Sequence, residues 1–340
     1  MRPTQALKVL QGLSKNYLVT GATGFIASHV CLELLQSGHC VVGVDNLNDY
    51  YDVRLKDWRL AQLENSSYAE NFHFQKLDIE DQYDLQTIFE NNRSFDAVLN
   101  LAARAGVRYS MGNPHVYLST NAEGTLNLLE CMRSYGCNKL VLASTSSLYA
   151  GQPMPFTEGL AVNEPLSPYA ASKKAAELMA YSYHKLYGMD VSVVRYFTVF
   201  GPAGRPDMSI FRFIKWIDEG TPIELFGDGS QSRDFTFVDD IANGTLAAIQ
   251  EVGYEIINLG GGRSPVSLNE IIERLENLMG KKAHIDHKPF HIADIKETWA
   301  DIDKAKNLLG WEPQVSLDEG LEKSVQWYLN NREWLQDIEV

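Results

Sequence analysis

Tyr169 and Lys173 stand four residues apart, directly after Ser167 and Pro168. Serine is a favoured N-cap and proline a favoured first helical residue, so a helix is predicted to begin here and to bring the phenol and the ammonium to one face. A free tyrosine has a pKa of about 10, and a nearby lysine cation favours its phenolate. Tyr169 is therefore a candidate general base, although an isolated Tyr-x-x-x-Lys is by default a packed tyrosine and a solvated lysine.

A run of hydroxyl side chains, Ser144-Thr145-Ser146-Ser147, stands at the end of a predicted strand. Such hydroxyls can hydrogen-bond an oxygen atom at a reacting centre. Alone, the run would more often be a turn or a helix cap. Its interpretation, like that of Tyr169, depends on what the rest of the chain places beside it.

A glycine-rich turn, Thr20-Gly-Ala-Thr-Gly-Phe-Ile-Ala27, follows the first predicted strand and opens a helix. Main-chain NH groups can meet a pyrophosphate there, because glycine lets the backbone approach closely. Asp45 ends the second predicted strand, near the spacing at which a carboxylate accepts hydrogen bonds from an adenosine ribose. Its charge would repel a 2′-phosphate, so NAD is predicted rather than NADP. Asp78 and Ile79 follow the third strand and either contact the adenine or form a plain turn.

The predicted NAD contacts include the turn, the ends of the second and third strands, the segment after the fourth strand and the Tyr-Lys pair. They are Gly21, Thr23, Gly24, Phe25, Ile26, Asp45, Asn46, Asp78, Ile79, Leu101, Ala102, Ala103, Tyr169 and Lys173.

Short apolar runs alternate with amphipathic stretches from residue 16 to residue 194, which is typical of βα units around a parallel sheet. Strands are predicted at residues 17–20, 40–45, 72–76, 97–101, 140–144 and 191–194. Beyond Tyr196 the pattern loosens into glycine- and proline-rich loops, with helices predicted at 268–279 and 317–330. The fold class is therefore α/β, a Rossmann-type doubly wound parallel sheet with a smaller, discontinuous C-terminal lobe.

Three parts are expected along the chain. Residues 1–15 form an N-terminal extension, residues 16–195 and 238–259 form the dinucleotide-binding domain, and residues 196–237 and 260–340 form the substrate-binding lobe. The lobe is discontinuous because a further βα unit is predicted at 238–259.

Composition restricts the class of partner. The 340 residues are 45% hydrophobic and 22% charged, and no window reaches the apolar length of a membrane span. The net charge of -14 disfavours nonspecific binding of nucleic acid or anionic membrane, so an anionic ligand would need local arginine clusters. The four cysteines form no Cys-x-x-Cys pair. We expect a cytoplasmic protein with reduced thiols, no membrane or nucleic-acid partner and no metal site.

Four segments, in order, resemble extended short-chain dehydrogenases: the glycine turn, Ala143-Ser-Thr-Ser-Ser-Leu-Tyr149, Tyr169-Ala-Ala-Ser-Lys173 and Arg233-Asp-Phe-Thr-Phe-Val-Asp-Asp-Ile241. The resemblance runs from about residue 16 to about residue 330. Within that family, the chain resembles UDP-glucuronate 4-epimerases most closely in Asn100-Leu-Ala-Ala-Arg-Ala-Gly-Val-Arg-Tyr-Ser110, Arg195-Tyr-Phe-Thr-Val-Phe-Gly-Pro202 and Gly204-Arg-Pro-Asp-Met208. The last segment is the most specific.

The resemblance implies a role for each matched residue. Tyr169 would be the base, Lys173 its electrostatic partner and ribose anchor, and Thr145 the hydroxyl beside the reacting C4 oxygen. Arg205 would face the sugar carboxylate and Arg233 the UDP phosphates. The other implied substrate contacts are Ser146, Ser147, Asn121, Thr198 and Asp294. For Asn121 and Asp294 a structural role is the alternative.

The implied reaction is an NAD-dependent inversion at C4 of a UDP-sugar, with UDP-glucuronate converted to UDP-galacturonate through a transient 4-keto intermediate. Tyr169 would remove the C4 hydroxyl proton while hydride passes to NAD, and the keto sugar would rotate before hydride returns. This intermediate is a β-keto acid, which loses carbon dioxide when its carboxyl bond aligns with the carbonyl. Arg205 and hydroxyls such as Ser146 or Ser147 would hold the carboxylate out of that alignment.

Several alternatives remain. UDP-glucuronate decarboxylases usually have Thr-Ser-Glu-Val-Tyr where this chain has Thr145-Ser-Ser-Leu-Tyr149, and 4,6-dehydratases need an Asp-Glu pair at Ser146-Ser147. A 4-epimerase of neutral or N-acetylated UDP-hexoses is a third alternative. A non-catalytic NAD-binding scaffold is a fourth, and the intact Thr145, Tyr169 and Lys173 argue against it.

The chain also departs from the family pattern. Ala27 replaces a glycine, Asn100 and Arg104 replace the usual His and Gln, and Ala150 follows Tyr149 where glycine is common. Arg104 adds a cation beside the expected site, and a solvated side chain is the preferred explanation.

The helical patterns at 114–134 and 168–187 resemble the pair that forms an intersubunit four-helix bundle in this family. A homodimer is therefore predicted. The alternative is that the apolar faces of these helices complete the core of one chain.

Overall fold

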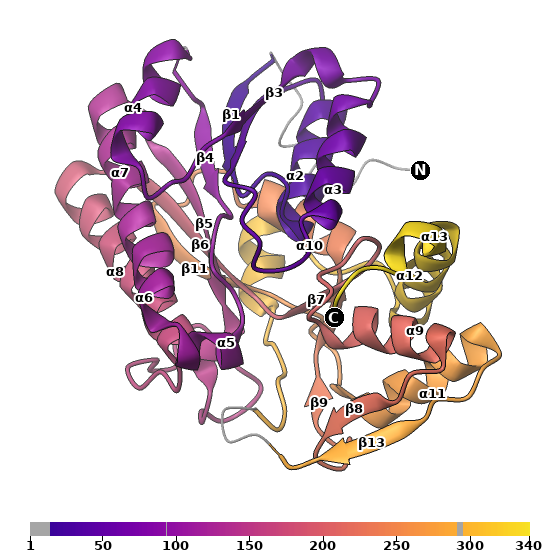
Figure 1. Cartoon of the computed structure of the whole chain (residues 1–340). Coiled ribbons are helices and arrows are strands. Elements are labelled where there is room, and N and C mark those ends of the chain that lie inside the picture. The colour runs from indigo at the N-terminus through magenta and orange to yellow at the C-terminus, as the bar shows by residue number, and fades with distance from the viewer. Residues whose placement is uncertain (1–13, 93, 291–294) are drawn as a thin grey trace.

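The computed structural model describes residues 14–92, 94–290 and 295–340, and its centre is a seven-stranded parallel sheet (Figure 1). The strand order is β11-β6-β5-β4-β1-β2-β3. The strands are β1 (Asn16–Thr20), β2 (Cys40–Asp45), β3 (Phe72–Lys76), β4 (Ala97–Asn100), β5 (Lys139–Thr145), β6 (Asp190–Tyr196) and β11 (Tyr254–Leu259). The order reverses between β1 and β4, where doubly wound sheets bind dinucleotides. The predicted fold class is confirmed.

Helices cover both faces of the sheet (Figure 1). One face carries α2 (Phe25–Gln36), α3 (Arg54–Glu64) and α10 (Val238–Ala247). The other carries α4 (Gln82–Asn91), α7 (Gly124–Tyr135) and α8 (Pro168–Tyr187). Before α7 come α5 (Val107–Gly112), α6 (Pro114–Tyr117) and the π-helical turn Leu118–Glu123, so the helical pattern predicted at 114–134 is present as consecutive segments.

The helix α8 begins and ends where its sequence predicts. Ser167 caps its first turn, because the Ser167 Oγ accepts a hydrogen bond from the Ala170 N at 3.1 Å. Pro168 is the first helical residue, where its missing NH costs nothing. Gly188 ends the helix with a φ of 72°, a left-handed conformation that favours glycine.

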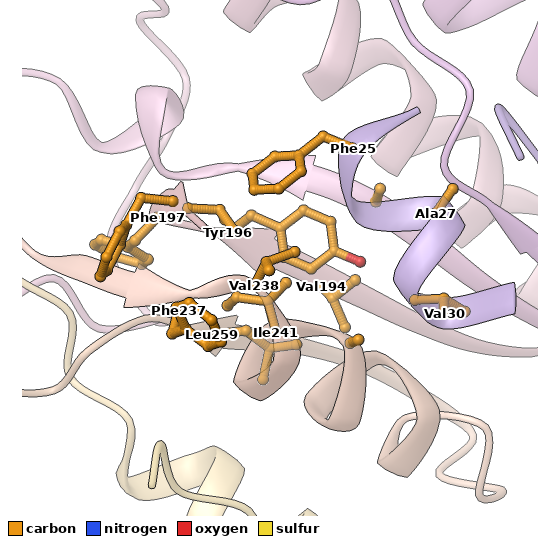
Figure 2. Close-up of a cluster of buried hydrophobic side chains, with 14 of the residues drawn as sticks. Phe25, Ala27, Val30, Val194, Tyr196, Phe197, Phe237, Val238, Ile241 and Leu259 are labelled. Carbon is orange, nitrogen blue, oxygen red and sulfur yellow. The ribbon is translucent and has the colours of Figure 1, made fainter. Parts of the chain in front are cut away.

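Figure 2 shows the apolar cluster that joins α2, α10 and the end of β6. Phe25, the first residue of α2, lies beside Tyr196 at the end of β6, and both are buried. Val238 and Ile241 of α10 complete this cluster below them. The Tyr196 hydroxyl is 2.8 Å from the Thr245 Oγ1 of α10. The first turn of α2 is therefore packed against the carboxyl end of the sheet.

The C-terminal lobe lies beside the carboxyl ends of the strands (Figure 1). Three two-stranded sheets pair β7 (Thr198–Phe200) with β10 (Phe235–Phe237), β8 (Ile223–Phe226) with β13 (Ile285–Lys288), and β9 (Ser232–Arg233) with β12 (Val266–Ser267). Its helices are α9 (Ser209–Glu219), α11 (Leu268–Met279), α12 (Leu317–Asn330) and α13 (Arg332–Leu335). The helices α11 and α12 occupy their predicted residues, whereas α9 was not predicted.

Short helical turns complete the described elements: Ala69–Asn71 before β3, Ser146–Tyr149 after β5 and Ala305–Leu309 before α12. Among the described residues, no helix has both the length and the apolar composition needed to cross a bilayer. All four cysteines are free thiols, and Cys31, Cys131 and Cys137 are buried.

Candidate active site

A cavity of about 710 Å³ runs along the carboxyl ends of the sheet strands and into the C-terminal lobe. Its walls include the glycine turn after β1 and the segment after β4, on the two sides of the point where the strand order reverses. The remaining walls come from the ends of β2, β5 and β6 and from α8 and α9. Open α/β sheets place ligands in this position.

The glycine turn leaves room only for backbone. Gly21 has a φ of 68°, and a Cβ atom there would lie 2.8 Å from the Ala102 Cα. A Cβ at Gly24 would lie 2.8 Å from the Gly21 O, and Gly24, the N-cap of α2, provides no side-chain cap. The first NH groups of α2 are therefore not capped by that side chain, which fits the binding of a pyrophosphate.

Asp45 is buried at the end of β2 and is oriented by backbone NH groups. Its Oδ2 accepts a hydrogen bond from the Thr23 N at 3.2 Å, and its Oδ1 accepts one from the Leu47 N at 2.9 Å. The Lys56 Nζ lies 3.9 Å from the Asp45 Oδ1. Burial lowers the pKa of Lys56, and the charge of Asp45 opposes that shift. Lys56 also lines the cavity, although the sequence analysis missed it.

The structure brings the predicted NAD contacts to one cavity, with one exception. Thr23 is fully buried and does not line the cavity, and its NH donates to Asp45. Thr23 therefore supports the site through Asp45. The predicted contacts that do line the cavity are Gly21, Gly24, Phe25, Ile26, Asp45, Asn46, Asp78, Ile79, Leu101, Ala102, Ala103, Tyr169 and Lys173.

Tyr169, Lys173 and Thr145 line the same cavity. Burial raises the pKa of Tyr169, while its hydrogen bond to Thr145 and the charge of Arg205 lower it. Burial lowers the pKa of Lys173 to about 8, and the negative charge of Glu177 opposes this shift. The role of Lys173 as electrostatic partner of Tyr169 stays a prediction, and the charge of Arg205 is a further influence that favours the phenolate. Glu177 stands one helical turn after Lys173 in α8.

A buried ion pair lies beneath this group and joins α8 to the sheet. Glu177 accepts hydrogen bonds from the Arg195 Nε at 2.9 Å, the Arg195 Nη2 at 2.7 Å and the Ser144 Oγ at 2.7 Å. The Arg195 Nη1 donates to the Tyr149 hydroxyl at 2.8 Å. Because the two charged side chains are each 1% exposed, this bidentate pair fixes the rotation of α8 relative to β5 and β6. The sequence analysis assigned no role to Glu177.

The loop that carries Arg205 is held at its start and by a pair within it. Before it, the buried Arg59 donates to the Ala203 O at 2.7 and 3.0 Å and to the Gly204 O at 3.3 Å. Arg59 also donates to the Thr23 O at 3.0 Å, so one side chain joins this loop to the glycine turn. Within the loop, Arg205 forms a bidentate pair with Asp207. Neither Arg59 nor Asp207 was among the predicted site residues.

The family model of the NAD dependent epimerase/dehydratase family matches residues 17–260 of this chain. The chain belongs to this family. A UDP-glucuronate 4-epimerase from Thermodesulfobacterium geofontis is 61% identical over 324 residues, covering 95% of this chain and 99% of that relative.

Two solved structures are also similar. The UDP-glucuronic acid 4-epimerase of Bacillus cereus in complex with UDP-glucuronic acid and NAD is 39% identical, with a TM-score of 0.87. The UDP-glucose 4-epimerase of Thermotoga maritima with UDP-glucose is 33% identical, with a TM-score of 0.84. Each match covers 93% of this chain and 99% of the other.

The predicted substrate contacts of this epimerase/dehydratase mostly share the cavity. Thr145, Ser146, Ser147, Thr198, Arg205 and Arg233 line it. Asn121 does not line it. Its Oδ1 accepts from the Arg104 N at 2.8 Å and its Nδ2 donates to the Arg104 O at 3.0 Å and to the Ser172 Oγ at 2.9 Å. These bonds fit the structural alternative for Asn121, which holds the segment after β4. Asp294 lies outside the described residues.

Arg104, a departure from the family pattern, lines the cavity. Its Nη1 donates to the Asn48 Oδ1 at 2.9 Å, and its Nε is buried without a hydrogen-bond partner among the described residues. The expectation of a solvated side chain was wrong, because the Asn121 bonds to the backbone of Arg104 direct this residue inward. No single-sequence signal separated this arginine from a solvated one.

Two further arginines line the lobe side of the cavity, and the sequence analysis missed both. The Arg108 guanidinium lies 3.9 Å from the centre of the Phe226 ring, and that of Arg212 lies 4.5 Å from the Trp216 ring. Arg233 is anchored by its Nη1, which donates to the backbone carbonyls of residues 232 and 296. These cations provide a local positive region in a chain whose net charge is -14.

Proposed function

We propose that this chain is an NAD-dependent UDP-sugar 4-epimerase that converts UDP-glucuronate to UDP-galacturonate. The observation that carries the proposal is that Tyr169, its partner Thr145 and the carboxylate-binding candidate Arg205 line one cavity with the glycine turn. The relatives that are named UDP-glucuronate 4-epimerases support the same substrate.

The residues of the cofactor side fit NAD. We assign the pyrophosphate to the turn at Gly21 and Gly24, the adenosine ribose to Asp45 and the nicotinamide ribose to Lys173. Bound NAD supplies an acceptor for hydride from C4 and returns the hydride to the opposite face of the sugar. The protein must therefore exchange a proton at the C4 oxygen and keep the sugar oriented in both half-reactions.

We assign the proton exchange to Tyr169, whose phenol takes the C4 hydroxyl proton and later gives it back. We place the Thr145 hydroxyl beside the C4 oxygen. The hydrogen bond between Thr145 and Tyr169 and the charge of Arg205 favour the phenolate, whereas burial disfavours it. Glu177 and Arg195 fix α8, so the phenol keeps its place in the cavity while the sugar rotates.

We assign residues 196–237 and 260–340 to the binding of the UDP-sugar. Arg233 and the neighbouring Arg212 suit the diphosphate, and Arg205 with the hydroxyls of Ser147 and Thr198 suits the sugar carboxylate. A serine at position 147, where decarboxylases usually have glutamate, favours epimerisation over loss of carbon dioxide.

The direct test is to incubate purified protein with UDP-glucuronate, without added NAD, and to identify the products. UDP-galacturonate should form without accumulation of a UDP-pentose. UDP-pentose with carbon dioxide would indicate a decarboxylase, and turnover of UDP-glucose or UDP-N-acetylglucosamine alone would indicate a neutral-sugar epimerase. No product from any of these substrates, with NAD still bound, would indicate a scaffold.

We also propose a homodimer that uses α8 and the helical segment before α7. Large apolar side chains on these elements are exposed, with fractions of 40 to 71%: Leu118, Leu178, Met179, Leu186 and Tyr187. Such apolar patches favour association. Light scattering should give twice the 38.2 kDa chain mass, and a monomer at micromolar concentration would contradict the proposal. A cytoplasmic location, consistent with four free thiols, is part of the same proposal.

A further inference from the structure

The guanidinium of Arg205 uses one of its two bidentate edges within its own loop. The Arg205 Nε donates to the Asp207 Oδ1 at 3.0 Å, and the Arg205 Nη2 donates to the Asp207 Oδ2 at 2.5 Å. A guanidinium carries five N–H donors in a planar fork, so this pair leaves the Nη1 hydrogens and one Nη2 hydrogen for another anion. These remaining donors form the end-on edge of the group.

Asp207 is itself held in place by an aromatic neighbour. The Tyr50 hydroxyl lies 3.4 Å from the Asp207 Oδ2, and the Arg205 guanidinium lies 5.8 Å from the centre of the Tyr50 ring. Tyr50 is packed against Gly106, where an added Cβ would lie 2.2 Å from the Tyr50 hydroxyl oxygen. The Arg205 and Asp207 side chains are 21% and 34% exposed, so the pair is partly desolvated at the cavity wall.

We propose that Asp207 is a positioning residue that aims the end-on edge of Arg205 at the carboxylate of a bound sugar. The inference rests on the proposed function and names a residue that favours epimerisation over the release of carbon dioxide. A carboxylate bound by an oriented fork is restricted in rotation, whereas one bound by a freely rotating cation is attracted but not oriented. Asp207 thus gives the charged Arg205 guanidinium a fixed orientation.

The products of the reaction report how well the carboxylate is oriented. If the C5–carboxyl bond of the 4-keto intermediate aligns with the π system of the C4 carbonyl, this bond breaks and carbon dioxide leaves. The bonding electron pair passes into the enolate of the ketone, which then takes a proton from solvent and yields a UDP-linked 4-ketopentose. Loss of Asp207 should therefore increase carbon dioxide release relative to epimerisation.

The experiment compares wild type, Asp207→Asn, Asp207→Glu and Asp318→Asn. The last is a matched control, because Asp318 pairs with Arg274 on the exposed side of α11 and α12, outside the cavity. Each variant is assayed with UDP-glucuronate for kcat, KM, carbon dioxide and pentose product. Calorimetry measures the Kd for UDP-glucose, which has no carboxylate.

For Asp207→Asn we expect kcat for epimerisation to fall by about tenfold, which corresponds to about 1.4 kcal/mol, while KM changes little because the charge of Arg205 remains. Carbon dioxide release should rise relative to wild type, and the Kd for UDP-glucose should stay within about twofold, since only the carboxylate contact is altered. Asp207→Glu should recover part of kcat, and Asp318→Asn should behave as wild type.

Two results would overturn the inference. Faster turnover and tighter binding of UDP-glucuronate in Asp207→Asn would show that Asp207 competes with the substrate for Arg205. An increase in the Kd for UDP-glucose as large as the loss of kcat for UDP-glucuronate would show a general structural role. Failure of wild type to epimerise UDP-glucuronate would instead contradict the proposed function, so the two claims fail separately.

Discussion

The two halves of the cavity are built differently. On the cofactor side, close backbone approach at Gly21 and Gly24 and the NH groups that hold Asp45 define the surface. On the sugar side, charged side chains from distant segments define it, and each depends on a partner, as Arg205 depends on Asp207. Backbone conformation therefore determines most of the first half, and side-chain contacts determine the second.

This difference predicts how substitutions act. A change on the sugar side should alter the choice and handling of substrate while NAD stays bound. Arg59, which hydrogen-bonds both the Thr23 carbonyl and the Ala203 carbonyl, is the residue at which the two halves are mechanically joined. The following variants test the separation, in order of decreasing effect.

Tyr169→Phe acts where the halves meet and should have the largest effect. Removal of the hydroxyl should lower kcat by about 10²–10⁴-fold, because general acid–base catalysis contributes a factor of that order. The fold and the bound NAD should be retained, since the ring remains. Turnover is measured with UDP-glucuronate, and NAD is measured in the supernatant after denaturation. Tyr83→Phe, at a tyrosine that is 82% exposed, is the matched control. Near-normal turnover of the Tyr169 variant would exclude the proposed base.

Arg205→Ala tests the sugar side alone. Loss of a charge-assisted hydrogen bond costs about 1.5–3 kcal/mol, so kcat/KM for UDP-glucuronate should fall by roughly tenfold to somewhat above a hundredfold. The binding of UDP-glucose should change far less, because it depends neither on a carboxylate contact nor on the Tyr169 phenolate that the charge of Arg205 favours. Arg274→Ala removes an exposed arginine outside the cavity and should leave both substrates unaffected. Equal losses for the two sugars would remove Arg205 from carboxylate recognition.

Lys173→Met tests how much the burial of a lysine charge destabilises the folded protein. Burial lowers the pKa of Lys173 to about 8 in the folded protein, so the unfolded chain binds more protons between about pH 8 and the ordinary lysine value of about 10.4. The loss of stability caused by burying the charged lysine is full below pH 8 and declines as pH rises from about 8 to about 10.4. Without NAD, the variant should therefore be more stable than wild type by on the order of 1–3 kcal/mol at pH 7.

The gain in the Lys173→Met variant is measured by denaturant unfolding at pH 7 and at pH 10. It should shrink at the higher pH. Lys174→Met, at the next residue of α8 with a side chain that is 21% exposed, should give no such gain. A destabilised Lys173→Met variant at pH 7 would show that the packing of the lysine outweighs the cost of burying its charge.

The sequence predicted the parts of the site that depend on local conformation. The glycine turn and the cap of α8 at Ser167 follow from residue types at fixed spacing. Glu177 and Arg59 were missed because they meet their partners only through tertiary packing. Arg104 was misjudged for the same reason, since its direction is set by Asn121. Asp207 was missed although it stands two residues from Arg205.

The central claim is a redox-neutral inversion at C4, and isotope tracing tests it most directly. UDP-glucuronate carrying deuterium at C4 is incubated with the enzyme in ordinary water, and a second sample of unlabelled substrate is incubated in deuterium oxide. The account predicts UDP-galacturonate that keeps the label at C4 in the first experiment and gains none there in the second. Exchange of the C4 hydrogen with solvent, or recovery of the substrate without an epimer, would contradict it.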